Sequence, residues 1–135
     1  MISQAEKEDF LKQKAIVIWM TGLSGSGKTT LASGLEKALF NRGYLTKILD
    51  GDHLRSGINK NLGFSDQERQ ENIRRVAEIS KLFVECGIIC IDSFISPSHE
   101  MRQMAKSIIG SDRFIEVYLK ASLEVCEKRD PKGLY

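Results

Sequence analysis

The sequence lacks an excess of charge of either sign, and it lacks a long apolar run. Its 135 residues include 20 basic and 18 acidic side chains, which leaves a formal net charge of +2. A balance this even does not indicate a nucleic-acid or membrane partner. No apolar run approaches the roughly 18 residues needed to cross a bilayer. The charged opening segment, MISQAEKEDFLKQK, also lacks the apolar core of a secretory signal.

Cysteine is scarce, and its count is odd. The three cysteines are Cys86, Cys90 and Cys126. An odd number without a secretory signal argues against a disulfide framework and for a reducing, cytoplasmic compartment. Cys86 and Cys90 are four positions apart in ECGIICID, which is typical of a helix end, a turn and a buried strand. We expect both to be small core residues rather than metal ligands.

Apolar runs alternate with helical patterns along the whole chain, without a repeat or a linker. The runs predict strands over 15–20, 45–50, 88–94 and 114–120, and the patterns between them predict helices over 28–41, 66–86, 98–109 and 122–129. This alternation indicates an α/β fold with a parallel sheet and helices on both faces, in a single domain over 1–135. Because such a sheet usually gains another strand and helix, we expect the domain to be cut short at its C-terminal end.

A glycine-rich motif, GLSGSGKTT, lies between the first predicted strand and the first predicted helix. It matches the P-loop pattern G-x-x-x-x-G-K-[ST], and a chance glycine-rich turn would not need these neighbours. Backbone N–H groups of such a loop surround a phosphate, the lysine reaches the β- and γ-phosphates, and the threonine hydroxyl ligates Mg²⁺. The predicted ATP-binding residues are Gly22, Leu23, Ser24, Gly25, Ser26, Gly27, Lys28, Thr29 and Thr30.

Two carboxylates follow the second predicted strand in ILDGDHLR. Ligands of an open parallel sheet collect at the carboxyl ends of its strands, where Asp50 and Asp52 are expected to lie. Asp52 could orient and deprotonate a hydroxyl under attack, and Asp50 could lie near a metal ion. A solvated acidic turn remains the alternative, with Asp52 capping a helical turn that begins at HLR.

Basic and aromatic residues follow these acids. Arg69 and Asn72 share a face at the start of a predicted helix and could hold an anion or a base edge, and Arg55 adds another positive charge. Phe64 precedes Ser65, which opens a capping-box pattern with Glu68. Phe64 is therefore either a hydrophobic staple or a flat platform for a purine ring.

The segment FISPSH follows the third predicted strand and should face the same cleft. It places Ile95 and Ser96 at the carboxyl end of that strand, where a plain strand-exit turn is the alternative interpretation. Asp92 lies earlier, inside the strand, and resembles the acid that ends a Walker-B strand. Because the strand is expected to continue beyond Asp92, Asp50 is the better candidate near a metal.

Four segments together carry a family resemblance. GLSGSGKTT, LDGDHLRSGINKNLGFSDQERQENIRRVAE, FISP and RDPKGLY resemble, in order and spacing, the adenosine 5′-phosphosulfate kinase (adenylyl-sulfate kinase) family over roughly residues 14–135. The resemblance implies transfer of the γ-phosphate of MgATP to the 3′-hydroxyl of adenylyl sulfate, which gives 3′-phosphoadenylyl sulfate. It also implies a homodimer and, in some proteins, a fused ATP sulfurylase domain.

The resemblance assigns roles to matching residues. Asp52 corresponds to the carboxylate at the acceptor hydroxyl, and Asp50 to its partner near the metal. The P-loop pattern makes Lys28 the other candidate catalytic residue and Thr29 a candidate Mg²⁺ ligand. The residues that would hold adenylyl sulfate are Asp52, Arg55, Phe64, Arg69, Asn72, Ile95, Ser96 and Lys132. Phe64 would stack on the adenine, and Ser96 is a candidate phosphoserine because some members are phosphorylated there.

Two departures from the family pattern stand out. His53 occupies a position where the family usually has Asn. The basic lid and the final strand and helix of the family are expected after RDPKGLY but are absent from this sequence. Two alternatives to the adenylyl-sulfate kinase function therefore stay open. One is a small P-loop kinase for a nucleoside monophosphate or a sugar acid, and the other is a non-catalytic nucleotide-binding module.

Overall fold

The computed structural model describes residues 1–23, 25–95, 98–120, 124 and 128. Its centre is a four-stranded parallel sheet in the order β2-β3-β1-β4. The strands are β1 (Val17–Thr21), β2 (Thr46–Asp50), β3 (Ile89–Ser93) and β4 (Phe114–Tyr118). Each predicted strand is present, and its ends differ from the prediction by two residues at most. The parallel α/β fold is therefore confirmed.

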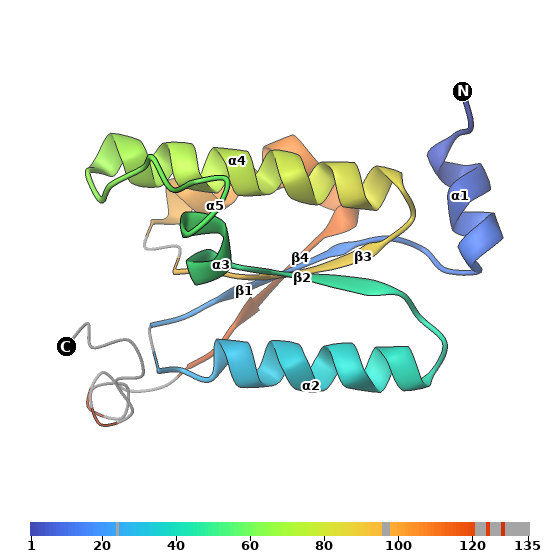
Figure 1. Ribbon diagram of the computed structural model, residues 1–135, viewed down its shortest axis with the longest axis horizontal. Helices are drawn as coiled ribbons and strands as arrows, with labels where there is room; N and C mark the ends of the chain where they lie inside the picture. Colours follow the sequence, from blue (N-terminus) through green and yellow to red (C-terminus); the bar gives the residue numbers. More distant parts are fainter. Residues whose placement is uncertain (24, 96–97, 121–123, 125–127, 129–135) are drawn as a thin grey trace.

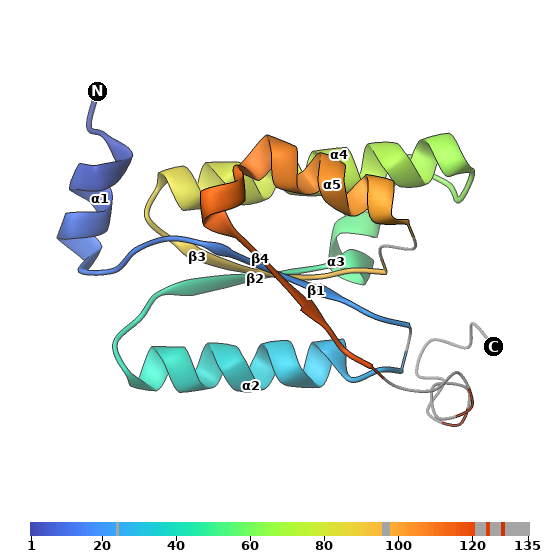
Figure 2. The same ribbon diagram turned by 180° about the vertical axis from the view of Figure 1, so that it is seen from behind.

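Helices cover both faces of this sheet. The helix α2 (Lys28–Asn41) lies on one face, and α4 (Asp66–Glu85) and α5 (His99–Ile109) lie together on the other (Figures 1 and 2). This arrangement follows from right-handed crossovers, because the chain moves from β1 to β2 in one direction and then returns. The helix predicted over 122–129 lies almost wholly outside the described residues.

Two apolar layers fill the space between the sheet and its helices. On the α4 and α5 side, Trp19 is fully buried and its ring lies 5.8 Å from the ring centres of both Phe94 and Phe114. On the α2 side, Met20 and Ile91 are buried. Side chains on both faces of β1 and β3 are therefore covered, which explains why these strands are apolar at nearly every position.

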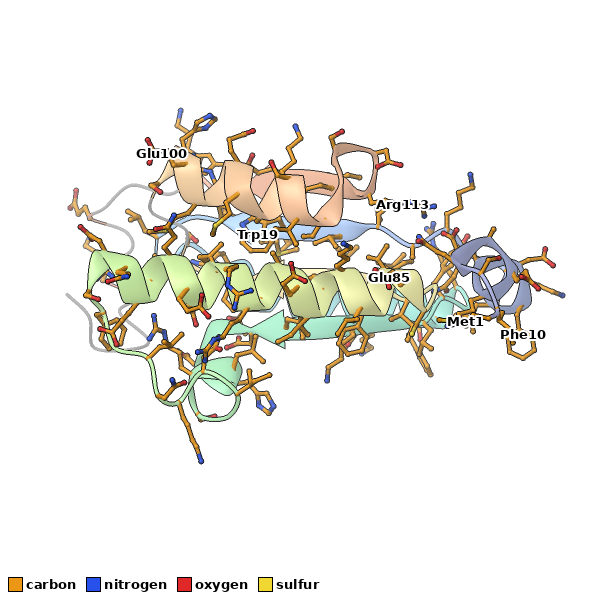
Figure 3. All side chains as sticks on the ribbon, turned by 90° about the horizontal axis from the view of Figure 1, so that it is seen from above. Met1, Phe10, Trp19, Glu85, Glu100 and Arg113 are labelled. Atoms are coloured by element: carbon orange, nitrogen blue, oxygen red, sulfur yellow. The ribbon has the colours of Figure 1, made fainter. Side chains whose placement is uncertain are left out.

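The N-terminal helix α1 (Gln4–Leu11) was not predicted. Ser3 and Glu6 form its capping box, but the helix has little apolar character of its own. Glu8 holds it to the domain, since its carboxylate accepts the Ala15 N–H at 2.6 Å and pairs with Arg113 at 2.6 Å. The Arg113 guanidinium lowers the pKa of Glu8. Figure 3 shows α1 and Arg113 at the same end of the molecule.

The cysteines only partly follow the prediction. Cys90 is buried, but Cys86 is exposed because it caps the C-terminus of α4 at the surface rather than facing the core. Cys126 lies outside the described residues. Among the residues that the structure does describe, no group of three His, Cys, Asp or Glu side chains could hold a metal ion. Within the same residues, no helix has the length and apolar character that a bilayer crossing requires.

Candidate active site

Three strands end side by side at one edge of the sheet. Met20 and Asp50 are both register partners of Ser93, so β1, β2 and β3 reach this edge together. The glycine-rich loop leaves β1 there, and the short helix α3 (Gly51–Arg55) begins directly after β2. In Figure 1, α3 lies at this end of the sheet, opposite the N-terminal helix. The topology therefore gathers the predicted donor and acceptor residues at a single edge.

The glycine-rich loop joins β1 to α2, as the P-loop pattern predicts. Gly22 has a φ of 150°, and a Cβ there would lie 2.7 Å from Ser26 Oγ and 2.9 Å from the Leu119 carbonyl oxygen. Only glycine fits this position, because a side chain would collide with Ser26 in the loop and with the backbone of Leu119, which follows β4. Thr29 and Thr30 are exposed in the first turn of α2. Ser24 lies outside the described residues.

Lys28 lies inside this loop rather than at its surface. The side chain is buried, and its Nζ donates to the carbonyl oxygens of Gly22 at 2.8 Å and Leu23 at 2.9 Å. The ammonium group is thus held by the same loop whose N–H groups are suited to surround a phosphate. The role of Lys28 at the phosphates of a nucleotide stays a prediction.

The two acids after β2 have different structural positions. Asp50 Oδ1 accepts the Asp52 N–H at 2.9 Å and so caps α3. The suggestion that Asp52 caps a turn beginning at HLR is therefore wrong, because the helix already starts at Gly51. Asp52 instead lies in the first turn with an exposed side chain that lines a cavity. His53 is also exposed, but it does not line this cavity.

The cavity has a volume of about 350 Å³ and lies beside α3. Its lining residues are Gly51, Asp52, Arg55, Phe64, Arg69, Asn72, Ile73, Phe94, Ile95 and Met101. Six of the eight predicted substrate-binding residues are among them, although they come from three separate segments of the chain. The other two, Ser96 and Lys132, lie outside the described residues. The structure thus brings together every predicted acceptor residue that it describes.

Arg55 ties α3 to the segment before α4. Its Nη1 donates to the carbonyl oxygens of Gly63 at 3.0 Å and Leu62 at 3.4 Å, and its guanidinium carbon lies 4.3 Å from the Phe64 ring centre. Burial lowers the pKa of Arg55, and the nearby charge of Arg69 lowers it further. Two neighbouring guanidinium groups that repel each other are suited to an anionic ligand between them.

The start of α4 contains a further bond beside the predicted capping-box residues. Ser65 Oγ accepts the Glu68 N–H at 3.2 Å, as expected of an N-cap. The Glu68 carboxylate also accepts the Gly63 N–H at 2.6 Å and the Ser65 hydroxyl at 2.9 Å. Phe64, next to Gly63, is 69% exposed and lines the cavity. An exposed ring beside an arginine favours the platform interpretation over the hydrophobic staple.

Asp92 is enclosed in the core and does not reach the cleft. It is fully buried, where it accepts hydrogen bonds from the Ser80 hydroxyl and, at 3.1 Å, from the Cys90 thiol. Burial raises its pKa to about 7. A side chain closed off in this way is not placed to ligate a metal at the sheet edge, which agrees with the lower rank that its position inside the strand indicated.

Sequence reasoning missed several residues that shape the cavity. Gly51, Ile73, Phe94 and Met101 line it, and Asn59 lies behind it with a hydrogen bond to Asn72. Phe94 is the first residue of the FISP segment. Its position beside Ile95 and Ser96, which were expected at the cleft, could have identified it. Apolar residues such as Ile73 carry no signal that distinguishes a cavity wall from ordinary core.

Comparison with known proteins gives a consistent result. The family model for adenylylsulphate kinase matches residues 14–135. An adenylyl-sulfate kinase from Bacteroides thetaiotaomicron is 58% identical over 135 residues, which are 100% of this chain and 67% of the relative. One from Phocaeicola vulgatus is 59% identical over all of this chain and 66% of its own length. The chain thus spans about two thirds of the length of these curated relatives.

Solved structures agree with the sequence relatives. The Mycobacterium tuberculosis APS kinase in complex with AMPPNP and APS is 42% identical, with a TM-score of 0.86 over 90% of this chain and 72% of that one. The family match and these similarities lead to one conclusion: the chain belongs to the adenylylsulphate kinase family, which consists of ATP-dependent phosphotransferases.

Proposed function

We propose that this protein transfers the γ-phosphate of MgATP to the 3′-hydroxyl of adenosine 5′-phosphosulfate and so forms 3′-phosphoadenylyl sulfate. The observation that carries this proposal is the cavity beside α3. It combines a carboxylate, Asp52, with two guanidinium groups and an exposed aromatic ring. These are the groups that an anionic adenine nucleotide with a reactive hydroxyl requires.

The donor nucleotide would occupy the glycine-rich loop from Gly22 to Thr30. The loop N–H groups and the N-terminus of α2 would hold its phosphates, and Lys28 would stabilise the charge on the transferred group. Mg²⁺ fits the donors present, since it needs few protein ligands and keeps several waters. The Thr29 hydroxyl and, through water, the Asp50 oxygen not used to cap α3 would hold it. When bound, the ion neutralises phosphate charge.

The acceptor nucleotide would occupy the cavity. Phe64 would stack on its adenine, and Arg55 and Arg69 would hold its phosphosulfate or phosphate oxygens. Asn72 and Ile95 line the same cavity and would complete the contacts. Ser96 and Lys132 are proposed as further contacts from the family resemblance, and Ser96 also as a phosphorylation site.

The reaction needs no covalent intermediate on the protein. Asp52 would accept a hydrogen bond from the 3′-hydroxyl, align its oxygen with the γ-phosphorus, and take the proton as the new P–O bond forms. The bond between the γ-phosphorus and the bridging oxygen breaks, and ADP leaves. Positioning the two nucleotides and stabilising the phosphoryl charge would supply most of the rate enhancement.

The cellular setting and the assembly of the protein are further parts of this proposal. A cytoplasmic location agrees with the exposed, unbridged Cys86. A homodimer and a link to ATP sulfurylase, either fused or separate, follow from the family resemblance. Size measurement in solution would test the homodimer, because a single-chain mass would contradict it.

An ATP-dependent assay for 3′-phosphoadenylyl sulfate tests the central proposal. The protein should convert adenosine 5′-phosphosulfate much faster than AMP, gluconate or shikimate at the same concentration. Preference for one of the other acceptors would instead indicate a different small P-loop kinase. ATP binding with no phosphoryl transfer to any acceptor would indicate a non-catalytic nucleotide-binding module.

A further inference from the structure

A pair of asparagine side chains connects the cavity wall to the residues behind it. Asn59 is fully buried, and its Nδ2 donates to Asn72 Oδ1 at 2.8 Å. Asn72 lies in the second turn of α4 and lines the cavity, whereas Asn59 belongs to the preceding segment and does not line it. The Asn72 side chain therefore has one edge against Asn59 and the other toward the cavity.

The direction of this hydrogen bond is set from behind by Arg75. A guanidinium group carries only donors, whereas a carboxamide has a donor end and an acceptor end. Arg75 Nη1 lies 3.4 Å from Asn59 Oδ1, so the oxygen of Asn59 faces Arg75 and its nitrogen faces Asn72. Arg75 is itself held in place, since it donates to Glu71 Oε2 at 2.8 Å and Asn61 Oδ1 at 2.9 Å.

The same argument from donors and acceptors applies to Asn72, which lines the cavity. Asn72 must offer its oxygen to the Asn59 nitrogen, so the NH₂ group of Asn72 occupies the opposite edge of its amide. An amide that could rotate would present either its oxygen or its NH₂ group to a ligand. A ligand atom that accepts hydrogen bonds would then meet a repulsive carbonyl oxygen in part of the molecules.

We propose that Asn59 is a positioning residue of the acceptor site. Anchored by Arg75, it holds Asn72 with the NH₂ group toward the cavity, so that Asn72 donates to an oxygen or a ring nitrogen of the bound nucleotide. This inference rests on the proposed function, which supplies the acceptor nucleotide. It assigns Asn59 an effect on acceptor binding although Asn59 does not touch the acceptor.

The first test replaces the Asn59 donor in the full natural chain. Asn59→Asp keeps the shape of the side chain and an oxygen for Arg75, but it presents oxygen to Asn72 and should make the Asn72 amide turn over. The KM for adenosine 5′-phosphosulfate should rise about tenfold, the effect of one lost hydrogen bond, while the KM for ATP stays unchanged. Asn59→Ala also removes the donor without adding a buried charge, and it should raise the same KM.

Asn61→Asp is the matched control. It makes the same Asn-to-Asp change at another residue whose side-chain oxygen accepts from Arg75. Asn61, however, is exposed and does not line the cavity. Both KM values should stay within about twofold of those of the wild type. An equal rise in the acceptor KM for the Asn61 variant would overturn the specific role of Asn59.

A double-mutant cycle separates positioning from general structural damage. In an Asn72→Ala background there is no amide left to orient, so Asn59→Asp should cause no further rise in the acceptor KM. Additive effects of the two substitutions, in a protein that turns over adenylyl sulfate, would overturn the positioning role and leave the proposed function intact.

A spectroscopic readout does not depend on turnover. In a ¹⁵N-labelled protein, Asn72→Ala should move the side-chain NH₂ resonances of Asn59 and accelerate their hydrogen exchange, because their acceptor is lost. Unchanged Asn59 resonances would overturn the inference directly. The Asn59 resonances could respond to Asn72→Ala while the wild-type protein does not phosphorylate adenylyl sulfate. This result would overturn the proposed function, and with it the assignment of the acceptor.

Discussion

The Arg55 guanidinium lies 4.3 Å from the centre of the Phe64 ring, and both residues line the cavity. The same guanidinium donates to the carbonyl oxygens of Leu62 and Gly63. Arg55 therefore shapes the segment that carries Phe64 and also supplies positive charge to the cavity. A planar guanidinium can do both, since its donors and its face act in different directions.

Substitution of Arg55 tests this double role. Arg55→Lys keeps the charge but cannot stack on Phe64 and reach both carbonyl oxygens at once. We expect the KM for adenylyl sulfate to rise about tenfold or more, with a smaller change in the KM for ATP. Steady-state kinetics at saturating ATP measures the effect. Arg74→Lys is the control, because Arg74 is exposed on α4 and pairs with Glu71 outside this cavity, and an equal effect of both would argue against a specific role for Arg55.

Asp52 is the candidate general base, and its removal should affect turnover most. Asp52→Asn keeps the shape of the side chain but removes the proton acceptor, so kcat should fall roughly 10²- to 10⁴-fold. Binding of ATP, measured by calorimetry, should stay close to that of the wild type. His53→Asn changes the next residue of α3, which is exposed and outside the cavity, and it should leave kcat nearly unchanged. Equal kcat values for the Asp52 variant and the wild type would remove Asp52 from the catalytic role.

Gly51 sets the distance between α3 and Phe94. A Cβ at Gly51 would lie 3.0 Å from Phe94 Cδ1, and Phe94 is backed by Trp19 at a ring distance of 5.8 Å. Because the ring has little room to retreat, Gly51→Ala should shift the start of α3 and displace Asp52 by a few tenths of an ångström. We expect kcat to fall about tenfold or more, since phosphoryl transfer is sensitive to alignment.

The Gly51 prediction has a spectroscopic and a genetic check. Trp19 is the only tryptophan, so its fluorescence should change when the Phe94 ring moves. Gly57→Ala is the control, because a Cβ there meets only the His53 carbonyl oxygen, at an ordinary 3.6 Å. A second substitution, Phe94→Leu, should restore part of the activity of Gly51→Ala. Wild-type kinetics for Gly51→Ala alone would show that α3 tolerates the contact.

Asp92 should make stability depend on pH. Ser80 Oγ lies within hydrogen-bond distance of both the Val76 carbonyl oxygen and Asp92, yet a hydroxyl has only one proton to donate. Because Ser80 shares its one proton between these two acceptors, it offsets only part of the cost of burying a charge, and burial raises the pKa of Asp92 to about 7. The unfolded chain releases the same proton near pH 4.

The sign of the effect follows from proton uptake. Between about pH 4 and 7 the folded state holds a proton that the unfolded state has lost, so the free energy of unfolding falls as pH rises through this window. Above pH 7 the buried charge costs at most roughly 4 kcal/mol. Asp92→Asn should remove this dependence and should be the more stable protein at pH 8. Denaturant unfolding at several pH values measures the free energy of unfolding of both proteins. The same pH dependence in the wild type and in Asp92→Asn would contradict the prediction.

Local features of the sequence were enough for the sheet and for the phosphate loop. The strands β1 and β3 are apolar on both faces, and GLSGSGKTT contains its own glycines, lysine and threonine. The helix α1 escaped prediction because it has little apolar character and is held to the sheet by a long-range ion pair, although its Ser3–Glu6 capping box is a local signal. Glu8 is bound by Arg113, which lies 105 positions away in the chain.

The sequence alone determined the parallel α/β fold, the phosphate loop and the family, because these depend on periodicity and on motifs within short segments. Only the tertiary structure decided that Asp50 caps α3 while Asp52 lines the cavity, and that Arg55 lies on Phe64. It also placed Asn59, which no motif distinguishes, behind Asn72. Such contacts depend on where β2, α4 and β3 lie in space. No local pattern in the sequence contains this information.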